Sequence, residues 1–317
     1  MARDAALPSV TIAILTFNGE KFLEDILIAI EGQEYGGVVE TLVVDSGSTD
    51  GTLSTLARHP SVRIHRIPNE EFGHGRTRAL AAELATGEIV VYLTHDAVPA
   101  DGRWLAEIVA PFVDDPRISA VIGKQVPRAS APPVLKYDIE RVFRSLGPDS
   151  GITVTWDVGR TMTRDQFRAA TFYSDANSAA RRSVLLGPVP YRDVPYAEDQ
   201  LFGRDLFERG YRKAYAPAAA VVHSNETSLR AFGSRIAADV RGLRGIGASI
   251  APISRFGAFK QFVKWSAADA AFIVIDDAYS RGRKFYWLLV NPWYHLAKWT
   301  AYRRATRSRV ESENPET

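Results

Sequence analysis

Residues 10–20 read VTIAILTFNGE, and residues 39–52 read VETLVVDSGSTDGT. Each stretch is a short apolar run that ends in small polar residues. A continuous run of β-branched and aliphatic residues is typical of a strand that is covered on both faces of a sheet. Both stretches therefore predict buried strands whose carboxyl ends carry polar side chains.

The same alternation continues to about residue 125. Between the apolar runs, apolar side chains recur every three or four positions, which predicts amphipathic helices. The expected strands are residues 10–15, 40–44, 62–67, 89–93 and 118–122, and the expected helices are residues 20–32, 51–58, 76–85 and 103–112. Alternating strands and helices predict an α/β fold, a mainly parallel sheet with helices on both faces. Ligands of such sheets bind at the carboxyl ends of the strands.

Beyond residue 126 the pattern is less regular. The expected elements are a helix, a loop, a helix and a strand, at residues 134–146, 147–163, 197–210 and 214–223. After His223 the pattern becomes entirely helical. These changes predict a first domain over residues 1–226 and a helical C-terminal extension over residues 227–317.

The composition is that of a globular protein. Of the 317 residues, 46% are hydrophobic and 24% are charged, which excludes a largely disordered chain. The absence of cysteine excludes disulfides, thiolate nucleophiles and iron–sulfur clusters, so any metal must be held by oxygen or imidazole. No secretory signal and no membrane-spanning stretch is recognisable. We therefore expect a cytoplasmic protein.

The net charge of +2 is unevenly distributed. Residues 227–317 carry 15 Lys and Arg against 7 Asp and Glu, whereas residues 1–226 carry 24 against 30. The basic C-terminal region is also rich in Phe, Trp and Tyr, a combination that favours an anionic membrane surface. Packing against the first domain or an oligomer interface would explain the same pattern. Nucleic acid is disfavoured because no recognised nucleic-acid motif accompanies the cations.

Several polar residues follow the expected strands directly. Asp45 could accept hydrogen bonds from a nucleobase or ribose, while residues 48–50 are better explained as caps of the next helix. Asp96 follows the strand at residues 89–93, and His223 ends a later strand. A carboxylate and an imidazole are a suitable pair for Mg or Mn, although His223 alone is more often an ordinary buried histidine.

Glu198 and Asp199 precede an apolar helical stretch. Acidic residues at this position interact favourably with the helix dipole in many proteins. The same position also suits a carboxylate that acts as a general base. The local sequence leaves both explanations open.

Taken in order, these segments resemble family 2 glycosyltransferases with the Rossmann-like GT-A fold. The matching segments are residues 16–20, 44–52, 75–87, 94–96, 198–199 and 223. Four segments are similar in particular to bacterial rhamnosyltransferases that use dTDP-L-rhamnose, namely residues 72–78, 94–97, 196–200 and 222–224. The resemblance covers residues 10–228 and implies a nucleotide-sugar half at about 10–125 and an acceptor half at about 126–226.

The resemblance also implies roles for individual residues. The nucleotide and its diphosphate would contact Thr16, Phe17, Asn18, Glu20, Asp45, Arg78, His95 and Asp96. Asp96 ends the family's Asp-x-Asp motif, whose first carboxylate is replaced here by Thr94, and Asp96 with His223 would hold the metal. Asp199 matches the catalytic base, with Glu198 beside it.

The sugar and the acceptor are expected to contact residues 172–177 with the arginines that follow. Asn177 and Arg181 belong to this group. Trp156 and Asp157 are expected to add an aromatic platform, although Trp156 is equally well explained as a core residue.

The predicted activity is inverting transfer of L-rhamnose from dTDP-L-rhamnose. The acceptor would be a hydroxyl of a glycan or lipid-linked glycan in bacterial surface polysaccharide synthesis, at the inner face of the cell membrane. Another nucleotide sugar is one alternative. A membrane-associated scaffold on a catalytically degenerate GT-A domain is the other, because one metal-binding carboxylate is missing.

Overall fold

The computed structural model describes residues 7–157, 159, 161–224 and 227–307, which divide into two compact units. The first unit comprises Met1–Pro127 and Ile139–Ser224, and the second comprises Arg128–Asp138 and Asn225–Thr317. Hydrophobic cores lie within each unit.

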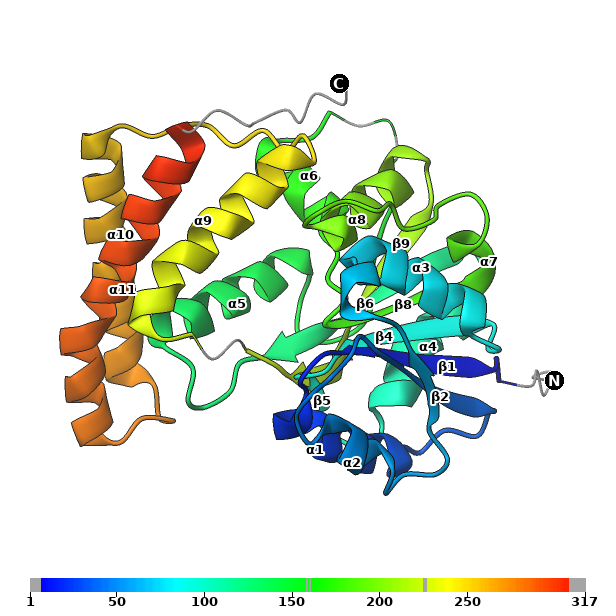
Figure 1. Cartoon of the computed structure of the whole chain (residues 1–317). Coiled ribbons are helices and arrows are strands. Elements are labelled where there is room, and N and C mark those ends of the chain that lie inside the picture. The colour runs from blue at the N-terminus through cyan, green and yellow to red at the C-terminus, as the bar shows by residue number, and fades with distance from the viewer. Residues whose placement is uncertain (1–6, 158, 160, 225–226, 308–317) are drawn as a thin grey trace, which may run out of the picture. The chain divides into compact units, whose positions relative to one another are not determined.

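Four parallel strands form one half of the sheet in the first unit (Figure 1). In the order β3-β2-β1-β4 they are Arg63–Arg66, Val39–Asp45, Val10–Thr16 and Ile89–Thr94. Val10 pairs with Val39 on one side and with Ile89 on the other, so β1, β2 and β4 begin level with one another. The parallel α/β sheet predicted from the apolar runs is confirmed.

The other half of the sheet is mixed. Counted over the described residues, the sheet has nine strands in the order β3-β2-β1-β4-β8-β6-β9-β5, and β7 pairs with β9. The remaining strands are β5 Val98–Pro99, β6 Ile118–Val126, β7 Thr153–Thr155, β8 Asn177–Arg181 and β9 Arg212–Val222. β8 runs antiparallel to both of its neighbours, β4 and β6.

β8 is a strand that the sequence did not predict. Its residues, Asn-Ser-Ala-Ala-Arg, include none of the β-branched or aromatic types that favour strands. The first four are buried because the strand lies between β4 and β6. Pairing with two long neighbours therefore overrides the weak local preference, and part of the segment expected to contact sugar is an interior strand.

Helices cover both faces of this sheet. One core lies under α1 (Glu20–Glu31), α2 (Thr52–Leu56) and α4 (Trp104–Asp114). The other lies under α3 (His74–Leu84), the second half of α5 (Pro133–Leu146), α7 (Arg182–Leu185) and α8 (Glu198–Glu208). Along β1, Ile12 and Ile14 face the first core and Ala13 faces the second, as the period of a strand requires. Two short helices, η1 (Asn69–Glu71) and α6 (Arg164–Thr171), complete the unit.

The second unit is helical. It contains α9 (Leu229–Gly245), α10 (Arg255–Ile275) and α11 (Arg281–Arg307), with the first residues of α5. Its core is aromatic and includes Tyr137, Phe232, Trp287 and Tyr294. The C-terminal helical extension expected from the sequence is confirmed. Among the described residues, no helix has both the length and the apolar character needed to cross a bilayer.

Replacing Gly123 with alanine should destabilise the first unit. The new methyl group on β6 would lie 2.1 Å from Asn177 Nδ2 and 2.3 Å from the Ala219 carbonyl oxygen. Overpacking of this kind costs about 1–3 kcal/mol, which urea unfolding followed by circular dichroism measures. Gly245→Ala in α9 is the control, because no atom lies within 4 Å of its methyl group. Equal unfolding midpoints for the two variants would contradict this packing.

Candidate active site

The carboxyl ends of β1, β2 and β4 lie side by side. Thr16 pairs with Asp45, and Leu15 pairs with Thr94, so three polar loops begin at the same edge of the sheet. A β-carbon on Gly19 would lie 3.2 Å from that of His95, so the loops after β1 and β4 are in contact. This edge gathers seven of the residues expected at the nucleotide: Thr16, Phe17, Asn18, Glu20, Asp45, His95 and Asp96.

The loops after β1 and β2 are held together by hydrogen bonds. The Asn18 backbone N–H donates to Ser48 Oγ at 2.9 Å. The Glu20 N–H donates to Asp50 at 3.2 Å, and the Glu20 carboxylate accepts from the Gly51 N–H at 3.0 Å. Each loop thus supplies a hydrogen-bond acceptor for the start of the other loop's helix.

The capping role expected for residues 48–50 is only partly observed. Asp50 accepts from the Thr52 N–H at 3.0 Å, as a residue capping α2 should. The side chain of Ser48 and the N–H of Thr49 bond Asn18 instead. Local preference for a cap was therefore overridden by the neighbouring loop.

Asp45 is buried at the end of β2. Its carboxylate accepts from the N–H groups of Gly47 and Ser48, both at 3.2 Å, and so shapes the turn that follows. Gly47 has a φ of +84°, a conformation that glycine adopts without strain. Phe17 is 42% exposed beside this turn and offers a ligand an aromatic face.

A chain of polar side chains runs inward from Asp96. Asp96 Oδ1 lies 3.4 Å from His223 Nε2, and His223 Nδ1 bonds the Gln125 side-chain oxygen at 2.9 Å. Gln125 in turn donates to Ser174 Oγ at 2.9 Å. Burial alone would raise the pKa of Asp96, but the hydrogen bond and charge of His223 hold it well below its usual range. The carboxylate is therefore ionised at neutral pH.

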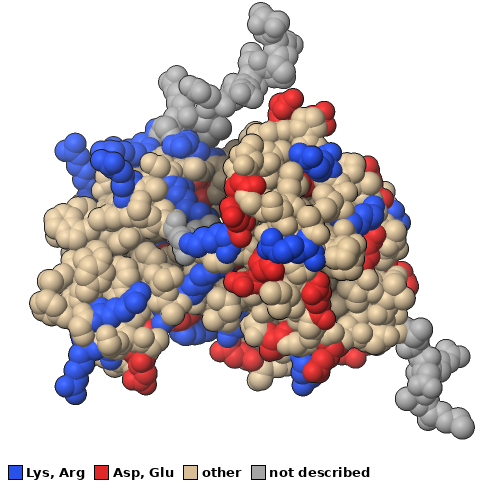
Figure 2. Space-filling view, turned by 60° about the horizontal axis from the view of Figure 1, so that its bottom comes forward, with Lys and Arg blue, Asp and Glu red and all other residues tan. Residues whose placement is uncertain are grey.

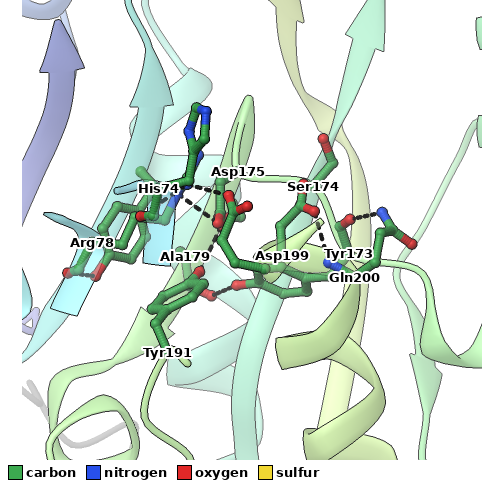
Figure 3. A network of polar contacts seen from close by, with 12 residues as sticks. His74, Arg78, Tyr173, Ser174, Asp175, Ala179, Tyr191, Asp199 and Gln200 are labelled. Carbon is green, nitrogen blue, oxygen red and sulfur yellow. Dashed lines mark hydrogen bonds and ion pairs between the residues drawn. The ribbon is translucent and has the colours of Figure 1, made fainter. Parts of the chain in front are cut away.

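Arg78 lies at the centre of a second polar network. Its guanidinium forms ion pairs with Asp175, at 2.7 Å from Nε, and with Glu198. All three side chains are buried. Tyr191 OH and Ser178 Oγ each donate to Asp175 at 2.7 Å. Figure 3 shows Arg78, Asp175 and Tyr191 converging from three separate segments of the chain.

Asp199 occupies the first turn of α8, next to Glu198. The residue before this helix, Ala197, has a φ of +60°, which an alanine rarely adopts and which costs free energy. Asp199 is partly exposed, and its Oδ1 accepts from the Gln200 N–H at 2.7 Å. Burial, followed by the negative charges of Asp175 and Glu198, raises the pKa of Asp199 to about 7.

Residues 173–175 connect the two polar networks. Ser174 receives the hydrogen bond from Gln125, and Asp175 binds Arg78. The Tyr173 carbonyl oxygen accepts from the Gln200 side chain, beside Asp199 (Figure 3). One short segment before β8 therefore contacts both the Asp96 side and the Asp199 side of the site.

Asn177 is committed to contacts within the protein. Its Oδ1 accepts from Trp104 Nε1 at 2.9 Å, and its Nδ2 donates to the carbonyl oxygens of Lys124 and Ala219. The side chain is fully buried. Asn177 therefore fastens β8 to its neighbours through both its side-chain oxygen and its side-chain nitrogen.

Arg181 is not brought to the site. It pairs with Ile89 at the beginning of β4, the opposite edge of the sheet from Asp96. Its guanidinium donates to the carbonyl oxygens of Ile118 and Phe112. We expected Arg181 to contact substrate because it follows residues 172–177 in sequence. Arg181 ends β8, and the length of this strand carries it away from those residues.

Trp156 and Asp157 lie near the start of β9, whereas His223 follows its end. The Arg212 guanidinium, on the first residue of β9, lies 4.7 Å from the centre of the Trp156 ring. Asp157 is exposed and accepts from the Gly159 N–H at 2.7 Å. The structure does not bring this pair to Asp96 and His223.

Sequence reasoning missed the partners that organise the site. Ser174 and Asp175 were noted only as part of a segment expected to contact sugar, and Tyr191 and Gln125 carried no local signal. Arg78 was expected near the base or diphosphate, yet its guanidinium binds two carboxylates. Arg78 and Glu198 are 120 residues apart in sequence, so no local pattern could pair them.

The fold and the site together define a class of protein. Polar loops at the ends of three parallel strands, with a carboxylate at the start of a later helix, are the arrangement expected of a glycosyltransferase with the GT-A fold. Residues 11–186, more than half of the chain, match the family described as Glycosyl transferase family 2. The chain belongs to this family, and it is a glycosyltransferase.

Two curated relatives are rhamnosyltransferases. The O-antigen chain rhamnosyltransferase RfbN of Salmonella typhimurium is 30% identical over 224 residues, which cover 70% of this chain and 68% of that protein. The N-acetylglucosaminyl-diphospho-decaprenol L-rhamnosyltransferase of Mycobacterium tuberculosis is 26% identical over 231 residues, covering 64% of this chain and 71% of that protein.

Solved structures confirm the GT-A fold. The mannosyltransferase PcManGT from Pyrobaculum calidifontis, determined in complex with GDP-Man and Mn2+, superposes with a TM-score of 0.60. The match covers 95% of this chain and 86% of that one, at 22% sequence identity. At this identity the similarity concerns the fold alone.

The raised pKa of Asp199 predicts a pH-dependent activity. We expect Asp199 to act as a general base, which must be ionised, so the rate should rise as the pH passes through about 7. Glu198→Gln removes a negative charge beside Asp199, which should lower its pKa and move the acidic limb of the rate profile down by about one pH unit.

The matched control is Glu208→Gln, on an exposed residue at the other end of α8, which should leave the limb in place. An acidic limb that is the same in both variants would show that Asp199 does not govern it.

Proposed function

We propose that the chain is an inverting glycosyltransferase that moves L-rhamnose from dTDP-L-rhamnose to a hydroxyl of a glycan or lipid-linked glycan. The reaction would serve bacterial surface polysaccharide synthesis at the inner face of the cell membrane. The observation that carries the proposal is Asp199, a partly exposed carboxylate with a pKa near neutrality. Its neighbour Gln200 bonds the segment at residues 173–175, which also bonds the Asp96 side of the site.

Asp199 supplies the base of this reaction. Ionised Asp199 takes the proton from the acceptor hydroxyl while the hydroxyl oxygen bonds to the anomeric carbon of the sugar. The bond between this carbon and the diphosphate oxygen breaks on the opposite face, and the nucleoside diphosphate leaves with the electron pair. A single displacement inverts the anomeric centre.

Glu198 and Arg78 act on the base rather than on the substrate. Both are buried and bind each other, so neither donates or accepts the transferred proton. The Glu198 charge raises the pKa of Asp199, and the Arg78 charge lowers it. Arg78 thus limits the rise in the pKa of Asp199, because its positive charge offsets the negative charges of Asp175 and Glu198.

The choice of rhamnose rests on the relatives and on the matched segments. Two proteins that align with about two thirds of this chain are named rhamnosyltransferases. The name of one of them describes an acceptor that is a lipid-linked diphosphate sugar. The segments around His74, Asp96, Asp199 and His223 are the ones that resemble this branch. A nucleotide sugar other than dTDP-L-rhamnose is the alternative that a donor screen decides.

Asp96 and His223 fit a divalent ion such as Mg or Mn. His223 Nε2 lies 3.4 Å from Asp96 Oδ1, and the Gln125 side-chain oxygen, 2.9 Å from His223 Nδ1, holds the ring in place. An imidazole that releases its Nε2 proton would present this nitrogen, together with the Asp96 carboxylate, to one cation. A divalent ion would neutralise the charge that develops on the leaving diphosphate.

This pair is a minimal set of ligands. Among the described residues, no group of three or more His, Asp or Glu side chains is placed to hold a metal. Hard divalent ions prefer six or more oxygen ligands. The remaining ligands would therefore be diphosphate oxygens and water, and metal and nucleotide should bind cooperatively.

Asp199→Asn should retain donor binding and lose turnover. Removing a general base typically costs about 100-fold or more in rate. The test measures nucleoside diphosphate release from a panel of dTDP, UDP and GDP sugars with Mg or Mn, and Asp165→Asn on exposed α6 is the control. Absence of turnover by the wild-type protein with every donor would contradict the transferase proposal.

The same variant separates the enzyme from the scaffold. The scaffold is favoured by one observation, the Thr94 that replaces the first carboxylate of the metal motif. Unchanged biological function of Asp199→Asn, tested by complementation of a deletion strain, would support the scaffold. Loss of function with an unchanged thermal unfolding profile would support the enzyme.

Calorimetry tests the metal site. Mn2+ should bind weakly to the protein alone and more tightly in the presence of dTDP, because the diphosphate completes the coordination. Asp96→Asn should abolish this dependence, while Asp101→Asn, an exposed control, should preserve it. Tight Mn2+ binding without nucleotide, or full activity in EDTA, would show that this assignment of Asp96 and His223 is wrong.

A further inference from the structure

A buried polar network lies within the aromatic core of the helix pair α10 and α11. Asp269 and His295 are fully buried and bonded at 2.7 Å, and Asn291 donates to the same carboxylate oxygen at 3.2 Å. Asn291 also accepts from the Val134 N–H at 3.0 Å. This network joins α10, α11 and the start of α5, so the two helices are held together by polar as well as apolar contacts.

The outward faces carry large apolar side chains. On α10 they recur at intervals of three or four residues near its start and again at its end, and on α11 they run along the first four turns. The exposed fractions on α10 are Phe256 75%, Phe259 60%, Val263 48%, Val274 56% and Ile275 69%, and on α11 they are Phe285 67%, Leu289 58%, Trp293 60% and Leu296 45%. We call this set the apolar stripe. A single exposed apolar residue is ordinary, but nine large apolar side chains exposed on two neighbouring helices mark an interaction site.

Basic side chains border the apolar stripe. Arg255 begins α10, and Arg303, Arg304 and Arg307 lie on the last turns of α11. Burial, and then the positive charges of these three neighbours, lower the pKa of Arg303, so the four guanidinium groups form one cluster. In the part of the chain that the structure describes, none of the four forms an ion pair.

The other end of the helix pair is also basic. Arg281 and Arg283 are exposed where α11 begins. From Arg255 to Arg307 the sequence has 10 Lys and Arg against 3 Asp and no Glu, and of these Asp269 is buried. Over α10 and α11, Figure 2 shows Lys and Arg gathered toward the two ends, with uncharged side chains between them.

We propose that the apolar stripe and its basic ends form a docking surface for an anionic lipid bilayer, with α10 and α11 lying in the plane of the membrane interface. The proposal deepens the proposed function, since it rests on the idea that the acceptor is lipid-linked. The apolar side chains would enter the boundary between headgroups and acyl chains, and the arginines would contact lipid phosphates.

The charges favour a bilayer over a second copy of the chain. In a symmetric dimer built on this face, surfaces with a large excess of positive charge would be brought together, which is unfavourable. An anionic surface removes this repulsion. Because no described helix is suited to span a membrane, the helices would lie on the bilayer.

Vesicle flotation of the full chain, without nucleotide, tests the proposal. The protein should float with vesicles of equal parts phosphatidylglycerol and phosphatidylcholine, and less with phosphatidylcholine alone. Phe285→Gln with Trp293→Gln should weaken binding at least about tenfold, because two large apolar side chains leave the bilayer. Val38→Gln, at a residue 74% exposed in the first unit, is the apolar control and should bind as the wild type does.

A second pair of variants tests the charges. Arg304→Glu with Arg307→Glu should remove the preference for phosphatidylglycerol, whereas Arg168→Glu, on exposed α6, should preserve it. Because all substituted side chains are exposed, circular dichroism should report unchanged folding.

Lipids with brominated acyl chains should quench Trp fluorescence in the wild type and quench it less in Trp293→Gln.

Three outcomes would overturn the proposal. They are absence of flotation with anionic vesicles, equal flotation of the stripe variant and the wild type, and a concentration-dependent dimer that only the stripe variant disrupts. Release of nucleoside diphosphate from the donor is measured separately without vesicles. Flotation without turnover would support the membrane surface and contradict the transferase proposal. Turnover without flotation would support the transferase and contradict the membrane surface.

Discussion

The ion pairs of Arg78 with Asp175 and Glu198 are the interaction on which the active site depends. They join α3, the segment before β8 and the first turn of α8, which are remote in sequence. Removing one partner of a buried ion pair is strongly destabilising, because it leaves a charge without compensation. Three carboxylates with one guanidinium still leave two negative charges in excess. Burial, followed by the negative charges of Asp175 and Glu198, raises the pKa of Asp199 to about 7, and burial also raises the pKa of Asp175.

The parallel half of the fold could be predicted from the sequence because each of its strands is recognisable from its own residues. The apolar runs that end at Thr16, Asp45 and Thr94 are long and β-branched, and each is followed by polar residues. The gathering of polar loops at one edge of the sheet follows from that pattern, since parallel strands end together. β8 could not be predicted in this way. Its residues become a strand only when β4 and β6 flank them, so Asn177 and Arg181 were assigned to the wrong surroundings.

In the second unit, too, some features could be predicted from the sequence and others depend on contacts between residues far apart in it. Its excess of cations and aromatic residues is a property of composition and was visible in the sequence. The buried bond between Asp269 and His295 was not, because the two residues lie on different helices. That bond joins the two helices within a core that also includes Trp287 and Tyr294, whereas Phe285 and Trp293 stay exposed. Composition alone does not tell which aromatic residues of α11 are buried and which face solvent.

Residues 173–175 give a physical reason why the two halves of the site should respond to each other. Ser174 is linked through Gln125 to His223 and Asp96, and Asp175 is linked through Arg78 to Glu198. A cation held by Asp96 and His223 would change the hydrogen bond between His223 and Gln125. Hydrogen-bonded chains in a low-dielectric interior polarise one another. These side-chain contacts, joined through the backbone of residues 174 and 175, therefore link the edge of the sheet at Asp96 to the carboxylates around Asp199.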